Sequence, residues 1–330
     1  MPPLRFGAIC IPIFSGFAAG PLAKRLRHAD AKILFTADGT LRRGKVIEIK
    51  HSADEAANHV PSLQRVIVLP RLGNKIAWNA TRDCWYRGFI EQGSTEKRAT
   101  LPVDAEAPAL ILYTSGTTGP PKGCVHSHGG CIAQIGKELA YHFDVKPSDR
   151  FFWLTDIGWM MGPWMLIGVH MQGGTAFLYE GALTHLGISP TAIRVLMRAG
   201  DEPVTRHDLS SLRFLGSTGE PWDDESYLWF FEEVGKKRLP IINISGGTEI
   251  IGCFLAPLPI TPLKPSTLRG PGLGMDIDVF DDAGKPVRGK TGHLVCKQAA
   301  PSMTRGFWKD RERYLSTYWS RWPNIWFHGD

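Results

Sequence analysis

The stretch from Leu110 to Gly130, LILYTSGTTGPPKGCVHSHGG, restricts the possible folds of this chain more than any other. An apolar run, Ala109 to Tyr113, has the length and flanks of a buried strand, and it leads into a loop of hydroxyls and glycines that ends in a lysine. Hydroxyl groups donate hydrogen bonds, glycines let main-chain N–H groups approach oxyanions, and a lysine adds a point charge. We therefore expect phosphate binding by Thr114, Ser115, Gly116, Thr117, Thr118, Gly119 and Lys122.

After this loop, the segment from Cys131 to Phe143 has apolar residues at helical spacing, so we expect the loop to join a strand to a helix. A Walker A loop is excluded, because Gly123 stands where that motif has its magnesium-binding hydroxyl. The loop instead closely resembles the signature T-S-G-[ST]-T-G-x-P-K-G of the AMP-forming adenylating enzymes. The resemblance implies that it grips the β- and γ-phosphates of ATP while a carboxylate attacks the α-phosphorus. The alternative is a surface loop with an incidental lysine.

The composition is typical of a globular protein, since 43% of the residues are hydrophobic and 21% are charged. A length of 330 residues is enough for one large or two ordinary domains. The net charge of +6 could suggest nucleic acid, yet the lysines and arginines are scattered, and small polyanions such as ATP or coenzyme A explain the charge as well. The charge alone decides nothing; we expect a small-molecule carboxylate as partner and no nucleic acid. No apolar run is long enough to span a bilayer, and Pro12 and Gly16 interrupt the apolar N-terminal run. We therefore expect a cytoplasmic protein without a membrane segment.

The six cysteines form no C-x-x-C pair, which favours reduced thiols over a disulfide framework. Four residues just after the loop could be read as metal ligands: Cys124, His126, His128 and Cys131. Their spacing matches no common zinc motif, so a metal centre is kept only as an alternative.

Residues 1 to about 100 alternate β-rich runs with helical or loop segments. We expect a β-rich run at Gly7 to Phe14, an amphipathic helix at 21–31, and strands at Lys32 to Phe35 and Val66 to Leu69. This rhythm predicts a parallel α/β sheet. The charged segment Ala80 to Thr100 is interpreted as a link.

Two segments of this region, GAICIPIFSGF and TADGTLRRGK, resemble segments that help to hold coenzyme A in the acetyl-CoA synthetase branch of the family. The resemblance implies that Gly16, Arg42 and Lys45 lie near the pantetheine and nucleotide ends of coenzyme A. The alternative is a solvated basic loop.

Two further motifs point to a bound acyl-adenylate. The run Asp-Ile-Gly-Trp ending at Trp159 corresponds to the family's D-x-G-W, whose indole lies beside the acyl group; an ordinary core tryptophan is the alternative. The segment Leu212 to Trp222 predicts a strand and a turn, and it resembles the adenine shelf of the family. The resemblance implies that the backbone of Gly219, Glu220 and Pro221 lies flat against the base, although taken alone the segment is an ordinary turn.

The segment IINISGGTEIIGCF carries the second strong signal, since its Thr-Glu pair matches the family pattern [YW]-[GWQ]-x-T-E. The resemblance implies that Thr248 binds the α-phosphate and that Glu249 ligates Mg²⁺, which prefers carboxylate and phosphate oxygens. Asn243 stands where acetate-specific members have an aspartate that contacts the adenine amino group, and an amide can still accept that bond. A helix-capping Thr/Glu pair is the alternative.

Gly246 replaces a tryptophan that closes the floor of the acyl pocket in acetate-specific members. The resemblance therefore implies an acyl chain longer than acetate, with flexible thioethers filling part of the space gained. The expected pocket is lined by Trp159, Met160, Met161, Thr218 and Gly246.

The last segments complete the resemblance. The G-x-G near Gly272 is not a dinucleotide site, because 275–280 alternates like a strand and Asp281 to Lys285 reads as a hairpin turn. The final PNIWFHGD resembles W-[FY]-x-[TS]-G-D, which makes Asp330 the ribose anchor, with His328 in place of the usual threonine or serine.

The fold implied by the resemblance is the α/β N-terminal domain of the adenylate-forming enzymes, incomplete and truncated at both ends. We expect residues 1–105 to form an α/β subdomain with the coenzyme A segments, and residues 106–262 to form a second one with the phosphate, adenine and Mg²⁺ motifs. Residues 263–330 are expected to form a β-rich subdomain ending at Asp330, with the C-terminal lid domain absent.

The implied function is an AMP-forming acid–CoA ligase that uses ATP, Mg²⁺ and coenzyme A on a short- or medium-chain carboxylic acid. Without the lid and its catalytic lysine, weak turnover is expected of this chain alone. A non-catalytic nucleotide-binding protein and a carrier-protein-charging adenylation domain are the alternatives. The sequence leaves the acid and the oligomeric state open.

Overall fold

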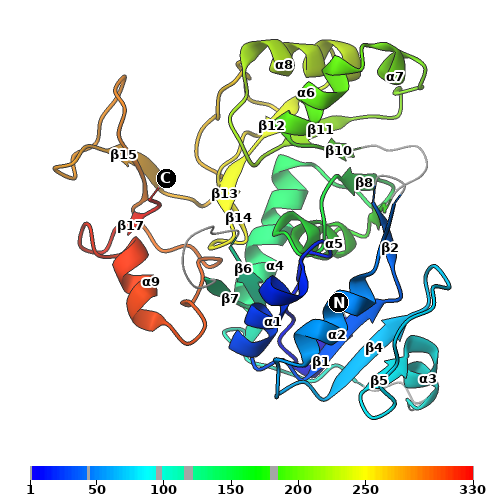
Figure 1. The fold of residues 1–330 in the computed structure, drawn as a ribbon. Helices are drawn as coiled ribbons and strands as arrows, with labels where there is room; N and C mark the ends of the chain where they lie inside the picture. Colours follow the sequence, from blue (N-terminus) through cyan, green and yellow to red (C-terminus); the bar gives the residue numbers. More distant parts are fainter. Residues whose placement is uncertain (1, 43–44, 94–98, 115–121, 179–184, 330) are drawn as a thin grey trace. The chain divides into compact units, whose positions relative to one another are not determined.

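The structure, a computed structural model, describes residues 2–42, 45–93, 99–114, 122–178 and 185–329. The chain forms two compact units. The smaller unit consists of Ile13–Leu101 and Tyr113–Lys122, and the larger unit of Met1–Pro12, Pro102–Leu112 and Gly123–Asp330. Helices and parallel strands are combined in each unit (Figure 1), which confirms the α/β class predicted from the sequence. The division into three subdomains stays a prediction.

The smaller unit is built on a parallel sheet whose order is β1 (Ile33–Ala37), β4 (Arg65–Leu69) and β5 (Asp83–Trp85). The three middle residues of β4 are buried, as expected of a central parallel strand. Its helices are α1 (Ala19–His28), α2 (Ile49–Ala57) and α3 (Tyr86–Glu91), and a hairpin joins β2 (Thr40–Arg42) to β3 (Lys45–Ile47). The predicted helix, the two strands and the parallel pairing are thus confirmed.

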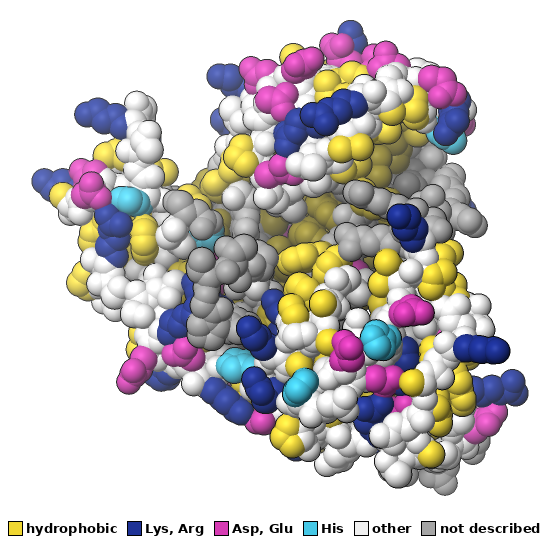
Figure 2. All heavy atoms as spheres, in the orientation of Figure 1, with side chains coloured by type: hydrophobic (Ala, Val, Ile, Leu, Met, Phe, Trp, Pro, Cys, Tyr) yellow, Lys and Arg dark blue, Asp and Glu magenta, His cyan; other side chains and the backbone are white. Residues whose placement is uncertain are grey.

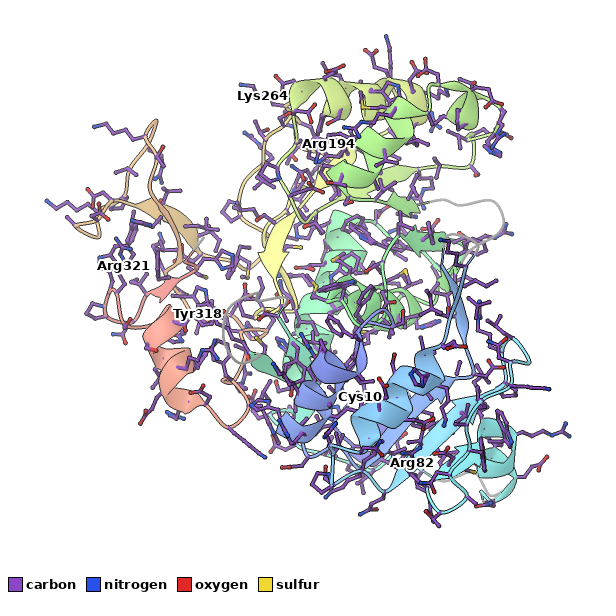
Figure 3. All side chains as sticks on the ribbon, viewed as in Figure 1. Cys10, Arg82, Arg194, Lys264, Tyr318 and Arg321 are labelled. Carbon is purple, nitrogen blue, oxygen red and sulfur yellow. The ribbon has the colours of Figure 1, made fainter. Side chains whose placement is uncertain are left out.

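Two sequence predictions in the N-terminal region were wrong. The link expected at Ala80 to Thr100 contains β5 and α3, because its charges are held inside the unit: the buried Lys50 Nζ lies 2.7 Å from Asp54 Oδ1 and 2.8 Å from Asp83 Oδ2. Arg82, labelled in Figure 3, also pairs with both aspartates. The β-rich run at Gly7 to Phe14 is reduced to one parallel bridge to Leu110 at Cys10, since a proline at position 12 cannot donate to a ladder.

The larger unit is built on a parallel sheet whose order is β12-β11-β10-β8-β9. These strands are β8 (Arg150–Trp153), β9 (Thr175–Ala176), β10 (His185–Gly187), β11 (Phe214–Ser217) and β12 (Ile241–Asn243). In chain order the arrangement reads 2-1-3-4-5, a doubly wound sheet, and such sheets bind ligands beyond the carboxyl ends of their strands. The motifs at 218–221 and 244–249 follow directly after the carboxyl ends of β11 and β12.

Helices cover both faces of this sheet. On one face, Leu215 and Ile241 pack with α6 (Pro190–Arg198) and α8 (Asp224–Trp229). On the other, Phe214 and Ile242 pack with helices α4 (His128–Lys137) and α5 (Met161–Met171). The alternation along each strand therefore puts one apolar residue into each layer. The remaining helical segments are η1 (Pro2–Phe6), η2 (Glu138–His142), α7 (Glu202–Thr205), η3 (Phe230–Val234) and α9 (Arg311–Tyr318).

The phosphate loop leads into a second strand and not directly into a helix, which corrects the sequence prediction. Strand β6 (Pro108–Tyr113) pairs with β7 (Gly123–Ser127), and all five residues of β7 are buried. The helix begins only at His128, where Ser127 caps it by accepting the N–H of Gly130. The short run CVHS thus forms a strand because both of its faces are covered.

The remaining strands of the larger unit are antiparallel. They are β13 (Ser245–Gly247) with β14 (Gly252–Leu255), and β15 (Ile277–Phe280), β16 (His293–Cys296) and β17 (Trp326–Phe327) in a second sheet. The predicted strand and turn after Gly272 are confirmed: Asp281 N–H donates to the carbonyl of Lys285.

Two surface properties bear on the predicted partners. None of the helices in the described part of the chain has the length and apolar character needed to cross a bilayer. On the face drawn in Figure 2, lysine and arginine side chains are scattered among acidic ones and do not gather in a stripe.

Candidate functional site

Thr248 and Glu249 lie in the turn that joins β13 to β14, in the larger unit. The turn is closed by the N–H of Ile250, which donates to the carbonyl of Gly247 at 3.2 Å. The Glu249 side chain is folded back over Gly247, where an added Cβ would collide with its carboxylate. Glu249 is therefore buried, at 6% exposure, which a capping pair on a helix surface would not be.

The two carbonyls of this turn are fixed by hydrogen bonds from β7 and from a nearby threonine. His126 Nε2 lies 2.7 Å from the carbonyl oxygen of Thr248, and the N–H of Thr304 donates to the carbonyl of Glu249 at 2.7 Å. Since a carbonyl can only accept, His126 carries its proton on Nε2. Burial lowers the pKa of His126 to about 4, so the ring is neutral at physiological pH.

His328 lies against Glu249. The sequence analysis noted this histidine only as a departure from the family pattern. His328 Nδ1 is 3.3 Å from Glu249 Oε1, and both side chains are at most 9% exposed. The imidazole also packs edge-on against the ring of Phe254, with ring centroids 4.9 Å apart. Asp330, the expected ribose anchor, lies outside the described residues.

A second buried carboxylate, which the sequence analysis missed, supports the strand after this turn. Glu138 Oε1 accepts the N–H of Cys253 in β14 at 2.7 Å and Gln134 Nε2 at 2.6 Å, while Glu138 Oε2 accepts Trp164 Nε1 at 2.6 Å. Burial raises the pKa of Glu138, against the effect of these donors. The only signal in the sequence was one glutamate within the otherwise apolar face of CIAQIGKELAYHF.

The candidate adenine residues form a turn that is anchored on one side and open on the other. Gly219 has a φ of +103°, and no atom lies within 4 Å of the position that a Cβ would take. Glu220 points to the start of α6, where its carboxylate accepts Thr191 N–H at 2.9 Å and pairs with Arg194 (labelled in Figure 3) at 2.7 Å. Asn243 Nδ2 donates to the carbonyl of Thr267 at 3.1 Å.

The space expected at Gly246 is filled by backbone, which corrects the idea that a missing indole leaves it open. Gly246 pairs with Cys253 at a register shift, and a Cβ added at Gly246 would overlap the carbonyl oxygen of Gly252. The two strands approach each other closely because neither residue 246 nor residue 252 has a side chain. Nearby, Thr218 Oγ1 donates to the carbonyl of Ile244 at 2.8 Å.

The other acyl-pocket candidates lie at the start of α5. Trp159 is 37% exposed, so the core alternative does not describe it. Met161 is buried in the core that α4 and α5 share, and Met160 packs against the same core.

The smaller unit carries the remaining candidates. Thr114 N–H donates to the carbonyl of Lys122 at 3.0 Å, which closes the neck of the phosphate loop; Ser115, Gly116, Thr117, Thr118 and Gly119 lie outside the described residues. The backbones of Arg42 and Lys45 are partners in the β2–β3 hairpin, and Gly16 lies in a turn before α1.

Three of the four residues of the alternative metal cluster have other roles. Cys124 lies in the core around Phe307, Cys131 in the core of α4, and His126 binds Thr248. Among the residues described, no three His, Cys, Asp or Glu side chains are grouped so as to hold a metal ion.

Comparison with known proteins places this geometry in one family. Residues 3–308 match the model of the AMP-binding enzymes. The chain is 40% identical to the acetyl-coenzyme A synthetase of Chlorobaculum tepidum and 39% identical to that of Pyrobaculum arsenaticum, over 99% of its own length and 52% of theirs. The chain thus spans about half the length of the curated relatives it matches.

A solved structure supports the same assignment. The acetoacetyl-CoA synthetase of Streptomyces lividans superposes with a TM-score of 0.86 at 32% identity, over 95% of this chain and 51% of the other. The chain therefore belongs to the AMP-binding enzyme family.

Proposed function

We propose that this chain carries the nucleotide- and acid-binding part of an AMP-forming acid–CoA ligase in the cytoplasm. The observation that carries the proposal is the match over residues 3–308 together with the buried Thr248–Glu249 turn. The named relatives are acetyl- and acetoacetyl-CoA synthetases, which supports a small carboxylic acid as substrate.

The proposed reaction has two steps. An oxygen of the substrate carboxylate attacks the α-phosphorus of ATP, the bond to the bridging oxygen breaks, and pyrophosphate leaves with that bond's electrons. The thiol of coenzyme A then attacks the acyl carbon, loses its proton, and releases AMP. Stabilising the charge that develops on the α-phosphate is the main task of the protein in the first step.

The residues of the chain divide this task. The loop from Thr114 to Lys122 would hold the β- and γ-phosphates, and Thr248 the α-phosphate. The adenine would lie on the open face of Gly219. Asn243 donates through Nδ2 to Thr267, and its Oδ1 would accept from the adenine amino group. Asp330 would accept both ribose hydroxyls.

Glu249 fits a magnesium ligand by the chemistry of its donor set. Mg²⁺ is commonly bound through one or two carboxylates and substrate phosphates while it keeps several waters, and Glu249 is a single carboxylate on the turn that carries Thr248. When bound there, the ion would neutralise charge on the phosphates. The turn's own contribution is to hold that carboxylate in place, which the bonds to its two carbonyls support.

The coenzyme A and acyl sites are proposed from the resemblance alone. Arg42, Lys45 and Gly16 would contact coenzyme A, and Trp159, Met160, Met161 and Thr218 would face the acyl chain. Since the backbone of Gly252 occupies the space next to Gly246, we assign no pocket enlargement to that glycine.

Carboxylate-dependent ATP–pyrophosphate exchange tests the proposal. It is measured with acetate, propionate, butyrate and hexanoate, first with this chain alone and then with the C-terminal half of an acetyl-coenzyme A synthetase supplied in trans. Exchange that depends on an acid and on Mg²⁺ supports the ligase. MgATP binding without exchange under either condition would instead select a non-catalytic nucleotide-binding protein.

A further inference from the structure

We infer that His126 is a positioning residue for the Thr248–Glu249 turn, and that with Thr304 it ties this turn to β7, the strand that leaves the phosphate loop. The inference rests on the proposed function and adds to it a residue that none of the sequence motifs assigns to nucleotide binding. His126 touches no substrate in this account and acts only through the turn.

The turn is connected to β7 by hydrogen bonds within the larger unit. His126 Nε2 donates to the carbonyl of Thr248 at 2.7 Å, and Thr304 N–H donates to the carbonyl of Glu249 at 2.7 Å. The segment that carries Thr304 is bound to β7 by the N–H of Arg305, which donates to the carbonyl of Val125 at 2.9 Å. The hydroxyl of Thr304 lies between two carbonyl oxygens, that of Val125 at 2.9 Å and that of Gly306 at 2.8 Å. Two consecutive carbonyls of the turn are therefore fixed to the same strand.

Fixing both carbonyls restrains the two side chains that the proposal uses. A rotation of the peptide between Thr248 and Glu249 would displace the Thr248 carbonyl and break the bond to His126. A tilt of the following peptide would break the bond to Thr304. The backbone from which the Thr248 hydroxyl and the Glu249 carboxylate extend thus keeps its position without substrate, and small errors of placement at a reacting centre are costly.

Strand β7 also directly follows the phosphate loop in the sequence. Strand β7 begins at Gly123, directly after Lys122, and His126 is its fourth residue. In the chain, β7 therefore directly follows the loop proposed to hold the β- and γ-phosphates, and it supports the turn proposed to hold the α-phosphate and Mg²⁺.

The chain offers a matched control in His185. This histidine is also in a strand and buried, at 1% exposure, and its Nε2 lies 2.8 Å from the carbonyl oxygen of Phe143. Burial lowers its pKa as it does that of His126. His185 differs in that its partner carbonyl belongs to none of the nucleotide motifs. A purely structural role would make the two histidines equivalent.

The test compares His126→Phe, His126→Gln and His185→Phe in the full 330-residue chain. Calorimetry gives the Kd for ATP over a series of Mg²⁺ concentrations, and urea unfolding gives the stability of each variant. We expect both phenylalanine variants to lose stability. Only His126→Phe should raise the Kd for MgATP, by about tenfold or more, and flatten its dependence on Mg²⁺. His126→Gln should recover most of the affinity, since its amide can present an N–H to Thr248.

Several results would overturn the inference. Equal changes of the Kd in His126→Phe and His185→Phe would reduce His126 to a structural residue, as would an unchanged Mg²⁺ dependence in His126→Phe. If His126→Phe does not fold, His126→Leu, which also lacks the N–H donor to the Thr248 carbonyl, carries the test, and an unchanged Kd and Mg²⁺ dependence in that variant would refute the inference. Failure of the wild-type chain to bind MgATP at all would instead refute the proposed function, and the inference with it.

Discussion

Replacing Asp38 with asparagine tests how one buried carboxylate organises the smaller unit. Asp38 is 1% exposed, and its two oxygens accept N–H groups at 2.9 Å from Arg71, 3.0 Å from Leu72, 2.7 Å from Gly73 and 3.2 Å from Asn74. An amide has one acceptor oxygen, so its NH₂ group faces some of these N–H groups whichever way it turns. Each N–H left without an acceptor costs about 1–3 kcal/mol, and this loop is partly exposed, so we expect a loss of about 2–3 kcal/mol.

Hydrogen exchange measured by mass spectrometry checks this prediction locally. A loss of this size should speed exchange of the amides of Arg71 to Asn74 about 30- to 150-fold. Asp208→Asn is the control, because Asp208 accepts a backbone N–H from Ser210 at 2.9 Å on the exposed surface. Unchanged exchange at Arg71 to Asn74 in Asp38→Asn, or an equal effect at Ser210 in the control, would refute the reasoning.

The same carboxylate predicts an acid dependence. Burial by itself raises the pKa of Asp38, but the four N–H groups outweigh it and leave the pKa below 3.8. A carboxyl with a lowered folded-state pKa stabilises the fold above its unfolded-state pKa, and this stability is lost as the pH falls through the folded-state pKa. The stability difference between wild type and Asp38→Asn should be constant near neutral pH and shrink below about pH 4.

Three further substitutions test the support of the Thr248–Glu249 turn. Glu138→Gln should cost about 1–3 kcal/mol in urea unfolding, because an amide cannot accept from Cys253, Gln134 and Trp164 together; a neutral result would exclude the proposed anchor. Gly246→Ala should destabilise by about 1–3 kcal/mol, since its Cβ meets the Gly252 carbonyl, whereas Gly88→Ala, with open space around it, should not. His328→Thr should lower the Mg²⁺ concentration at half-maximal ATP binding, because the imidazole lies against the Glu249 carboxylate that would hold the metal; an unchanged midpoint contradicts this.

The sequence was sufficient for the elements that carry continuous apolar runs or dense motifs. The runs at Val66 to Leu69 and Ala109 to Tyr113 form largely buried strands, and the amphipathic segment 21–31 largely coincides with α1, because burial of apolar residues decides such segments. The short strand β7 was missed, since CVHS has no alternation and forms only when both faces are covered.

The contacts around the candidate site could not be predicted, because they join residues far apart in the chain. His126 and Thr248 are separated by 122 positions, and Glu138 and Cys253 by 115. A lone buried histidine or glutamate gives no periodic signal before its partner is known. The opening inferred at Gly246 failed for a related reason: a missing side chain was filled by the approach of another strand.

The central claim is that the loop ending at Lys122 and the turn at Glu249 act on one MgATP. A double-mutant cycle with Lys122→Ala and Glu249→Gln, measured by calorimetry with MgATP, tests it most directly, with Lys75→Ala as an exposed lysine control. We predict that each single variant raises the Kd at least about tenfold. The loss of binding free energy in the double variant should be smaller than the sum of the two single losses, since both groups serve the same phosphates. A Glu249→Gln variant that binds MgATP as the wild type does, or losses that simply add, would contradict the account.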